Sequence, residues 1–73
     1  MTNKSYSKEY AKLAKKLKQA RIKAGLDQVD LAKLLDKTQS YISKIEEAKL
    51  HIDIFELKKL SIHFKKDINY FIS

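Results

Sequence analysis

The chain has 73 residues, which rules out two domains, because a single domain commonly takes about 100 to 150 residues. Apolar residues make up 44% of it and charged residues 34%, so it is too hydrophobic to be disordered, and without cysteine it has no disulfide and no cysteine-based metal site. We therefore expect one small domain over residues 1–73, stabilised by its own core.

The charge is strongly positive and unevenly distributed. Sixteen Lys and Arg against nine Asp and Glu give a formal net charge of +7, and residues 1–25 contribute eight of the basic side chains but one acidic side chain. Such a charge favours a polyanionic partner, either nucleic acid or an anionic membrane surface. No apolar run approaches the ~18 residues of a membrane span, and we see no signal-peptide stretch, so we expect a cytoplasmic protein.

The first predicted element is a long amphipathic helix. Apolar residues recur at steps of three, four and seven from Tyr10 to Ala24, with lysines at the remaining angles, which predicts a helix over about residues 7–24. Gly25 is the only glycine and is the expected left-handed stop. We expect residues 1–6 to form a flexible arm.

Two short helices are expected next. Asp27 is a good N-cap, and with Asp30 three positions later as a capping-box partner it predicts a helix over residues 28–35. Thr38 is a second good N-cap and predicts a helix over about residues 39–47. The connection between the two helices is only two or three residues long.

Two further helices complete the chain. Asp53 followed by Glu56 resembles another capping box and predicts a helix that ends at about Phe64. Asp67 is expected to cap a last turn or two over residues 68–72. Because no segment shows convincing two-residue alternation, the expected class is all-α with five helices.

The second and third helices have the pattern of a helix-turn-helix motif. A turn this tight makes them cross at a steep angle. Ala32 is small enough for the two helices to approach each other closely. Asp36 lies where the chain must turn left-handed. Ile42 and Ile45 point back into the core. The alternative interpretation is an ordinary corner between two helices of a bundle.

Four segments of the chain together match a known pattern. They are Arg-Ile-Lys-Ala-Gly-Leu-Asp-Gln at 21–28, Asp-Leu-Ala at 30–32, Thr-Gln-Ser-Tyr-Ile-Ser-Lys-Ile-Glu at 38–46 and Asp-Ile-Asn-Tyr-Phe-Ile at 67–72. Over about residues 8–72 the chain resembles the Cro/C1-type (Xre) family of phage and bacterial repressors. The resemblance implies a compact five-helix, lambda-repressor-like domain that binds operator DNA, usually as a homodimer.

The second helix of the motif contains the residues expected to read DNA bases. Gln39, Ser40 and Lys44 follow the Thr38 cap by one, two and six positions and project outward. A glutamine can bind adenine through N6 and N7, and a lysine can donate to guanine, each pair discriminating by ~1–3 kcal/mol. The candidates for base contacts are Gln39, Ser40, Tyr41, Ser43 and Lys44.

Phosphate contacts and structural roles are also expected. The resemblance places Gln28 against a phosphate, where it also braces Gln39, and it implies a structural pair between Arg21 and Glu46. Helix N-termini suit phosphate because their N–H groups and dipole favour an anion. The phosphate candidates are Gln28, Thr38, Lys49, Arg21 and His51. The structural candidates are Arg21, Glu46, Ala32, Ile42 and Ile45.

Three positions depart from the family pattern. Many relatives have Ser, Thr or Asn where this chain has Asp27, and a carboxylate repels a phosphate unless capping occupies it. Ala48 and Lys65 stand where relatives commonly have glycine, and a left-handed conformation costs a non-glycine residue ~1–2 kcal/mol.

The sequence thus predicts a sequence-specific transcriptional repressor that binds double-stranded DNA at a palindromic operator as a homodimer. The candidates for the dimer contact are the C-terminal residues Ile68, Tyr70, Phe71 and Ile72. No spacing of Ser, His and acidic residues assembles a catalytic group, so we expect no enzymatic activity, no cofactor, no metal and no small-molecule substrate.

Two other functions remain as alternatives. The first is an antitoxin-like protein-interaction module in which DNA binding is secondary. The second is a cationic protein that lies on a membrane surface through its first helix; it is the weaker alternative, because the apolar stripe of that helix is modest and interrupted by Arg21.

Overall fold

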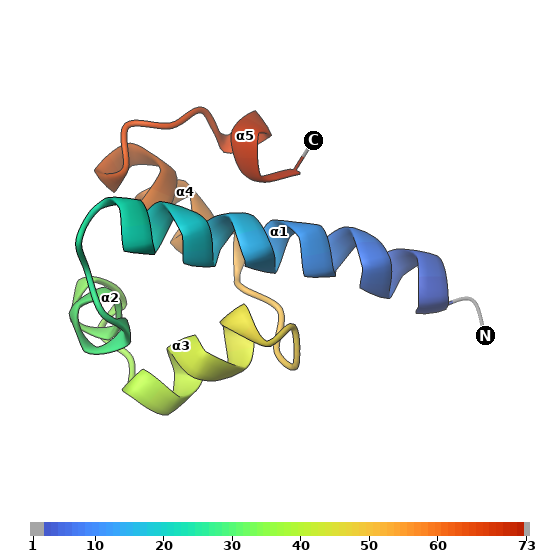
Figure 1. Cartoon of the computed structure of the whole chain (residues 1–73), viewed down its shortest axis with the longest axis horizontal. Helices are drawn as coiled ribbons and strands as arrows, with labels where there is room; N and C mark the ends of the chain where they lie inside the picture. The colour runs from blue at the N-terminus through green and yellow to red at the C-terminus, as the bar shows by residue number, and fades with distance from the viewer. Residues whose placement is uncertain (1–2, 73) are drawn as a thin grey trace.

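The computed structural model describes residues 3–72, and side chains from residue 8 onward. Its elements are α1 (Asn3–Lys23), α2 (Gln28–Leu35), α3 (Gln39–Glu46), α4 (Ile54–His63) and α5 (Ile68–Ile72), shown in Figure 1. The described part of the chain contains no strand. The predicted all-α, five-helix class is therefore confirmed.

Most helix ends lie close to their predicted positions. The bounds of α2 agree with the prediction, and α3 and α4 each end one residue early. The main difference is in α1, which begins at Asn3, so that residues 3–6 are helical where a flexible arm was expected. Residues 1–2 lie outside the described residues.

The caps of the motif helices are formed as predicted. The N–H of Asp30 donates to Oδ1 of Asp27 at 2.8 Å, and the N–H of Asp27 donates to Oδ2 of Asp30 at 3.0 Å, which completes the capping box. Oγ1 of Thr38 accepts from the N–H of Tyr41 at 3.1 Å. Both helix starts are thus fixed by local hydrogen bonds.

The start of α4 differs from the prediction. Asp53 caps the helix by accepting from the N–H of Phe55 at 2.7 Å. Glu56 does not close the expected capping box; its carboxylate accepts from the Tyr41 hydroxyl at 2.5 Å. A tertiary partner on α3 has replaced the local one.

Four residues that end helices have positive φ. Gly25 at 76° and Asp36 at 56° do so where the sequence predicted left-handed turns. Ala48 at 61° and Lys65 at 58° adopt the same conformation without being glycine. Asp tolerates this region better than most residues, so the strain that a side chain causes there is greatest at Ala48 and Lys65.

The core draws side chains from all five helices. The largest fully buried side chains are Leu17, Leu31, Ile42, Ile45, Leu60 and Phe71. Ala32 is also buried, as the close approach of α2 to α3 requires. Phe71 is only 1% exposed, which corrects its prediction as a dimer contact, because its ring belongs to the core. Of the four C-terminal candidates, Ile68 and Tyr70 pack against this core and Ile72 is exposed.

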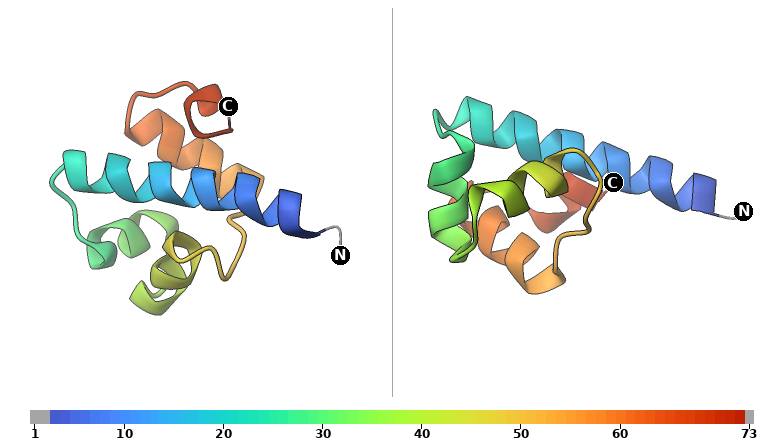
Figure 2. Two further views of the ribbon diagram at one scale, coloured as in Figure 1. Left: turned by 45° about the vertical axis from the view of Figure 1, so that its right-hand side comes forward. Right: turned by 90° about the horizontal axis from the view of Figure 1, so that it is seen from below.

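Helix α1 runs across the molecule with α2 and α3 on one side and the α4–α5 loop and α5 on the other (Figure 1). Seen from below, α3 faces the viewer with α1 along one side and α4 along the other (Figure 2). Within residues 3–72, every helix is too short or too polar to span a membrane. The arrangement leaves the outer side of α3 open.

Candidate nucleic-acid interface

The outer side of α3 carries polar side chains because its apolar ones are used in the core. Ile42 and Ile45 are buried against α1 and α2, so residues on the opposite side of this two-turn helix face solvent. Gln39, Ser40 and Lys44 are exposed there, as predicted. These three side chains form what we call the reading surface.

Ser43 and Tyr41, the other two base-contact candidates, are both half-buried. Ser43 donates to the Glu47 carboxylate at 3.3 Å. Tyr41 packs against the core and donates to Glu56 on α4. Burial, followed by the hydrogen bond to Glu56, raises the pKa of Tyr41 to about 12, so its hydroxyl stays protonated at neutral pH. The structure therefore directs this hydroxyl toward α4 rather than outward.

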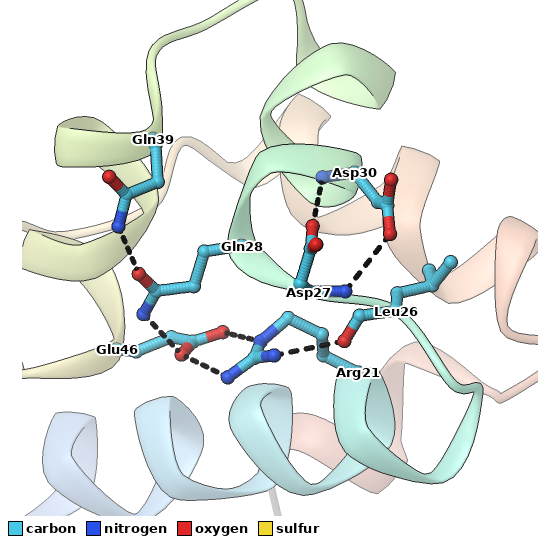
Figure 3. Close-up of polar contacts among 7 residues, drawn as sticks. All are labelled: Arg21, Leu26, Asp27, Gln28, Asp30, Gln39 and Glu46. Atoms are coloured by element: carbon cyan, nitrogen blue, oxygen red, sulfur yellow. Dashed lines mark hydrogen bonds and ion pairs between the residues drawn. The ribbon is translucent and has the colours of Figure 1, made fainter.

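Behind the reading surface lies a buried ion pair (Figure 3). Nε of Arg21 donates to Oε2 of Glu46 at 2.7 Å, and Nη2 donates to Oε1 at 3.1 Å. The third guanidinium nitrogen donates to the carbonyl oxygen of Leu26 at 2.9 Å. The side chains of Arg21 and Glu46 are 10% and 3% exposed, so the pair fastens α1 to the end of α3 in a low-dielectric setting. This placement turns Arg21 toward protein rather than toward solvent.

Two glutamines extend this pair to the surface. Nε2 of Gln28 donates to Oε1 of Glu46 at 3.0 Å, and Nε2 of Gln39 donates to Oε1 of Gln28 at 2.6 Å. An ionised carboxylate only accepts hydrogen bonds, so Gln28 must turn its NH2 toward Glu46 and its oxygen toward Gln39. Gln39 must then donate from its own NH2 to that oxygen of Gln28. The buried carboxylate thereby sets the orientation of both amides.

The amide of Gln39 keeps the groups that a base would need. Its NH2 has two N–H donors, of which Gln28 takes one, and its Oε1 is not used in this chain of hydrogen bonds. One donor and one acceptor therefore remain on the exposed end. This is the pair that binds N7 and N6 of adenine in the major groove.

The phosphate candidates at the helix starts are placed as expected. Gln28 is the first residue of α2, and Thr38 caps α3, so both lie where backbone N–H groups have no partner within the helix. Asp27 remains a departure. The N–H of Asp30 lowers the pKa of its carboxyl, so an ionised carboxylate stands beside the start of α2.

The loop after α3 is fastened to α1 by Tyr10. Its hydroxyl donates to the carbonyl oxygen of Leu50 at 2.9 Å and accepts from the N–H of Ile52 at 2.8 Å. The exposed His51 has its ring centroid 4.3 Å from that of Tyr10. Lys49 lies 3.3 Å from the carboxylate of Glu47, and since both are exposed this pair contributes only ~0–1 kcal/mol. Lys49 can therefore exchange Glu47 for a phosphate at little cost.

The comparison with protein families decides between the motif and an ordinary helical corner. A family model described as helix-turn-helix matches residues 17–71. The chain belongs to the Cro/C1-type helix-turn-helix family. It is therefore a DNA-binding helix-turn-helix regulator. No curated protein and no solved structure matches the chain significantly.

Three side chains that position the interface of this helix-turn-helix protein were not foreseen. Glu56 holds Tyr41, and Lys37 lies 5.2 Å from the centroid of the same ring and 3.8 Å from Glu56. Tyr10 holds in place the loop that contains Lys49. Only the contact of Lys37 with Tyr41, four positions apart, had a local signal in the sequence. Tyr41 and Glu56 are 15 positions apart, and Tyr10 and Leu50 are 40 positions apart.

Proposed function

We propose that this regulator recognises a specific operator by placing α3 in the major groove, with Gln39 reading adenine and Lys44 reading guanine. The supporting observation is the hydrogen-bonded series from Arg21 through Glu46 and Gln28 to Gln39, which fixes the reading amide before DNA arrives. A side chain ordered in advance loses less conformational entropy on binding. Ser40 adds a hydroxyl that can serve either a base or a phosphate.

We propose repression as the regulatory outcome. A domain that occupies an operator overlapping a promoter excludes the transcription machinery by its bulk alone. Gln28, Thr38 and Lys49 would set the register on the duplex through phosphates while the reading surface selects the sequence. Arg21 would contribute indirectly, through Glu46, since its guanidinium is turned into the protein.

We further propose a homodimer on a pseudo-palindrome with half-sites ~34 Å apart, about one helical turn of DNA. A two-fold interface needs one surface that can cover itself. The most exposed apolar side chains on a single helix are those of α4, where Phe55 is 77% exposed and Ile54 and Ile62 are also exposed. Phe55 and Ile62 are seven residues apart, so they share one face of the helix. This surface is a better candidate than α5, where Ile72 is the only exposed apolar side chain.

The reading surface can be tested by selecting bound duplexes from a random library with the wild type, Gln39→Ala and Lys44→Ala. We expect the wild type to enrich a two-fold motif, Gln39→Ala to lose an adenine preference and Lys44→Ala a guanine preference, each at a cost of ~1–3 kcal/mol. Gln19→Ala and Lys18→Ala remove the same side-chain types from exposed positions on α1 and should leave the motif unchanged. Failure of the wild type to enrich any motif, or an unchanged motif in both α3 variants, would refute the assignment.

A further inference from the structure

The positive charge of the protein does not lie on the reading motif. Residues 26–48, which contain α2 and α3, carry three basic and five acidic side chains. The excess lies before them, in residues 1–25 with eight basic and one acidic, and after them, in residues 49–73 with five and three. A function for this charge must therefore be sought on the other helices.

Part of the charge surrounds a groove between the C-terminal half of α1 and the segment that joins α4 to α5. Two hollows of about 250 and 390 Å³ adjoin Lys23, and Lys65 and Lys66 line the first of them. Tyr70 lines the second hollow, and its ring centroid lies 4.6 Å from Nζ of Lys66, which links the two. We call this the α1–α5 groove; it lies across α1 from α3 (Figure 1).

The groove combines positive charge with exposed apolar surface. Among the described residues, no carboxylate lines either hollow, and Lys23, Lys65 and Lys66 form no ion pair with a described side chain. Phe64 and Ile22 supply apolar surface, and Ile22 is exposed although it is aliphatic. The first hollow is smaller than the ~300–1,000 Å³ typical of small-molecule sites and the second is within the lower part of that range, which suits a few side chains better than a whole ligand.

We propose that the α1–α5 groove docks an acidic segment of a partner protein. Carboxylates of that segment pair with Lys23, Lys65 and Lys66, and one apolar side chain covers Ile22 and the ring of Tyr70. Such charge-assisted hydrogen bonds are stronger than neutral ones. A nucleic-acid backbone offers phosphates but no apolar group to cover Ile22, so protein is the better occupant.

A second copy of this chain is a poor occupant. Its own acidic stretch is residues 26–48, where Asp27 caps α2 and Glu46 is buried beneath the reading surface. Docking that stretch into the groove would cover α3 and block DNA. A separate partner can bind while α3 is on DNA, because the segment joining α4 to α5 lies across α1 from α3 (Figure 1).

The test uses short synthetic peptides and the full chain. In the first peptide glutamates flank a central Leu-Phe pair; in the second glutamines replace the glutamates; in the third two serines replace Leu-Phe. We expect the first to shift backbone amide resonances in residues 19–24 and 63–70 but not in α3, and the other two to bind at least about tenfold more weakly, a loss of ~1.4 kcal/mol.

Matched variants separate a docking site from general attraction to a basic protein. Lys23→Glu with Lys66→Glu should weaken the first peptide about tenfold or more, whereas Lys8→Glu with Lys33→Glu makes the same change in net charge at exposed positions of α1 and α2 that do not line the groove and should weaken it much less. Ile22→Ser alters no charge and should also weaken binding. Thermal melting of each variant checks that it is folded.

Several results would overturn the proposal. They are resonance shifts confined to α3, equal binding of the glutamine peptide, equal loss in the two double-charge variants, and displacement of the peptide from the groove by a duplex without operator sequence. Failure of this proposal is distinguishable from failure of the DNA-reading assignment, because the groove variants should still select the wild-type operator motif.

Discussion

The side chain of Gln39 shows how a single residue is prepared for recognition. The sequence predicted that it projects outward, and the structure adds that it gives one N–H to Gln28. That hydrogen bond does not disable the amide; it selects which donor and acceptor remain. Because Glu46 sets this choice from within the protein, the reading amide depends on Arg21, which neutralises Glu46 but faces away from solvent.

Tyr41 gives a prediction about pH. Its pKa, about 12 in the folded protein against ~10 in the unfolded chain, means that folding favours the neutral phenol. This contribution to stability is therefore complete below pH ~10 and is lost as the pH rises through about 12. We expect tyrosinate absorbance to show that Tyr41 ionises late in the wild type. Tyr41→Phe should reduce the late part of that titration, and it should flatten the loss of unfolding free energy over this alkaline range.

The same substitution tests the hydrogen bond to Glu56. Losing a hydrogen bond to a carboxylate costs ~1.5–3 kcal/mol, which chemical denaturation at neutral pH can measure. Tyr70→Phe is the matched control, since Tyr70 packs on the core but does not hold Glu56. A late step that persists in Tyr41→Phe and vanishes in Tyr70→Phe would contradict the assignment.

At the scale of single residues, local contacts were predictable and distant ones were not. Asp27, Asp30 and Thr38 cap helices through neighbours three positions away, so their roles follow from the sequence. The pairing of Arg21 with Glu46, 25 positions apart, was available only from the family resemblance. The contact between Tyr41 and Glu56 had no such guide, and a local capping box was wrongly predicted instead.

The residues that follow α3 and α4 adopt a strained left-handed backbone, and a substitution can relieve that strain. Ala48 has φ of 61°, where a Cβ atom crowds the backbone and glycine does not. We expect Ala48→Gly to raise the free energy of unfolding by ~1 kcal/mol, measured by denaturant titration, because relief of the strain exceeds the added entropy of the unfolded chain. Ala11→Gly in the exposed part of α1 should have the opposite effect, a loss of ~0.5–1 kcal/mol. Equal destabilisation in both variants would show that Ala48 is not strained.

Among the helices, length determined how well the sequence could be interpreted. In α2, with eight residues and a cap, the periodicity gave both ends. The five residues of α5 complete little more than one turn, so periodicity could not separate the core residue Phe71 from the exposed Ile72. The start of α1 was missed because Asn3, Lys4 and Ser5 are polar and continue the helix without extending its apolar stripe.

On the scale of the whole molecule, the three candidate binding surfaces belong to different elements. The reading surface lies on α3, the α1–α5 groove lies between α1 and the segment after α4, and the exposed apolar side chains Phe55 and Ile62 lie on α4. DNA, an acidic protein segment and a second copy would therefore not compete for one surface. Sequence composition gave the net charge but not this separation, which depends on how the helices pack.

The proposed dimer leads to the last prediction. Phe55 contributes to the α4 surface but little to the core of one subunit, since it is 77% exposed. Phe55→Ser should therefore leave the melting temperature of the isolated domain unchanged. Because a two-fold interface loses a phenyl ring from each subunit, the substitution should cost ~3–6 kcal/mol, or roughly 150- to 25,000-fold in dimer affinity, measured by sedimentation. Binding to a full palindrome should weaken accordingly, while binding to a single half-site should not. Ile72→Ser is the control on α5; if it dissociates the dimer and Phe55→Ser does not, the interface lies on α5 and the assignment to α4 is wrong.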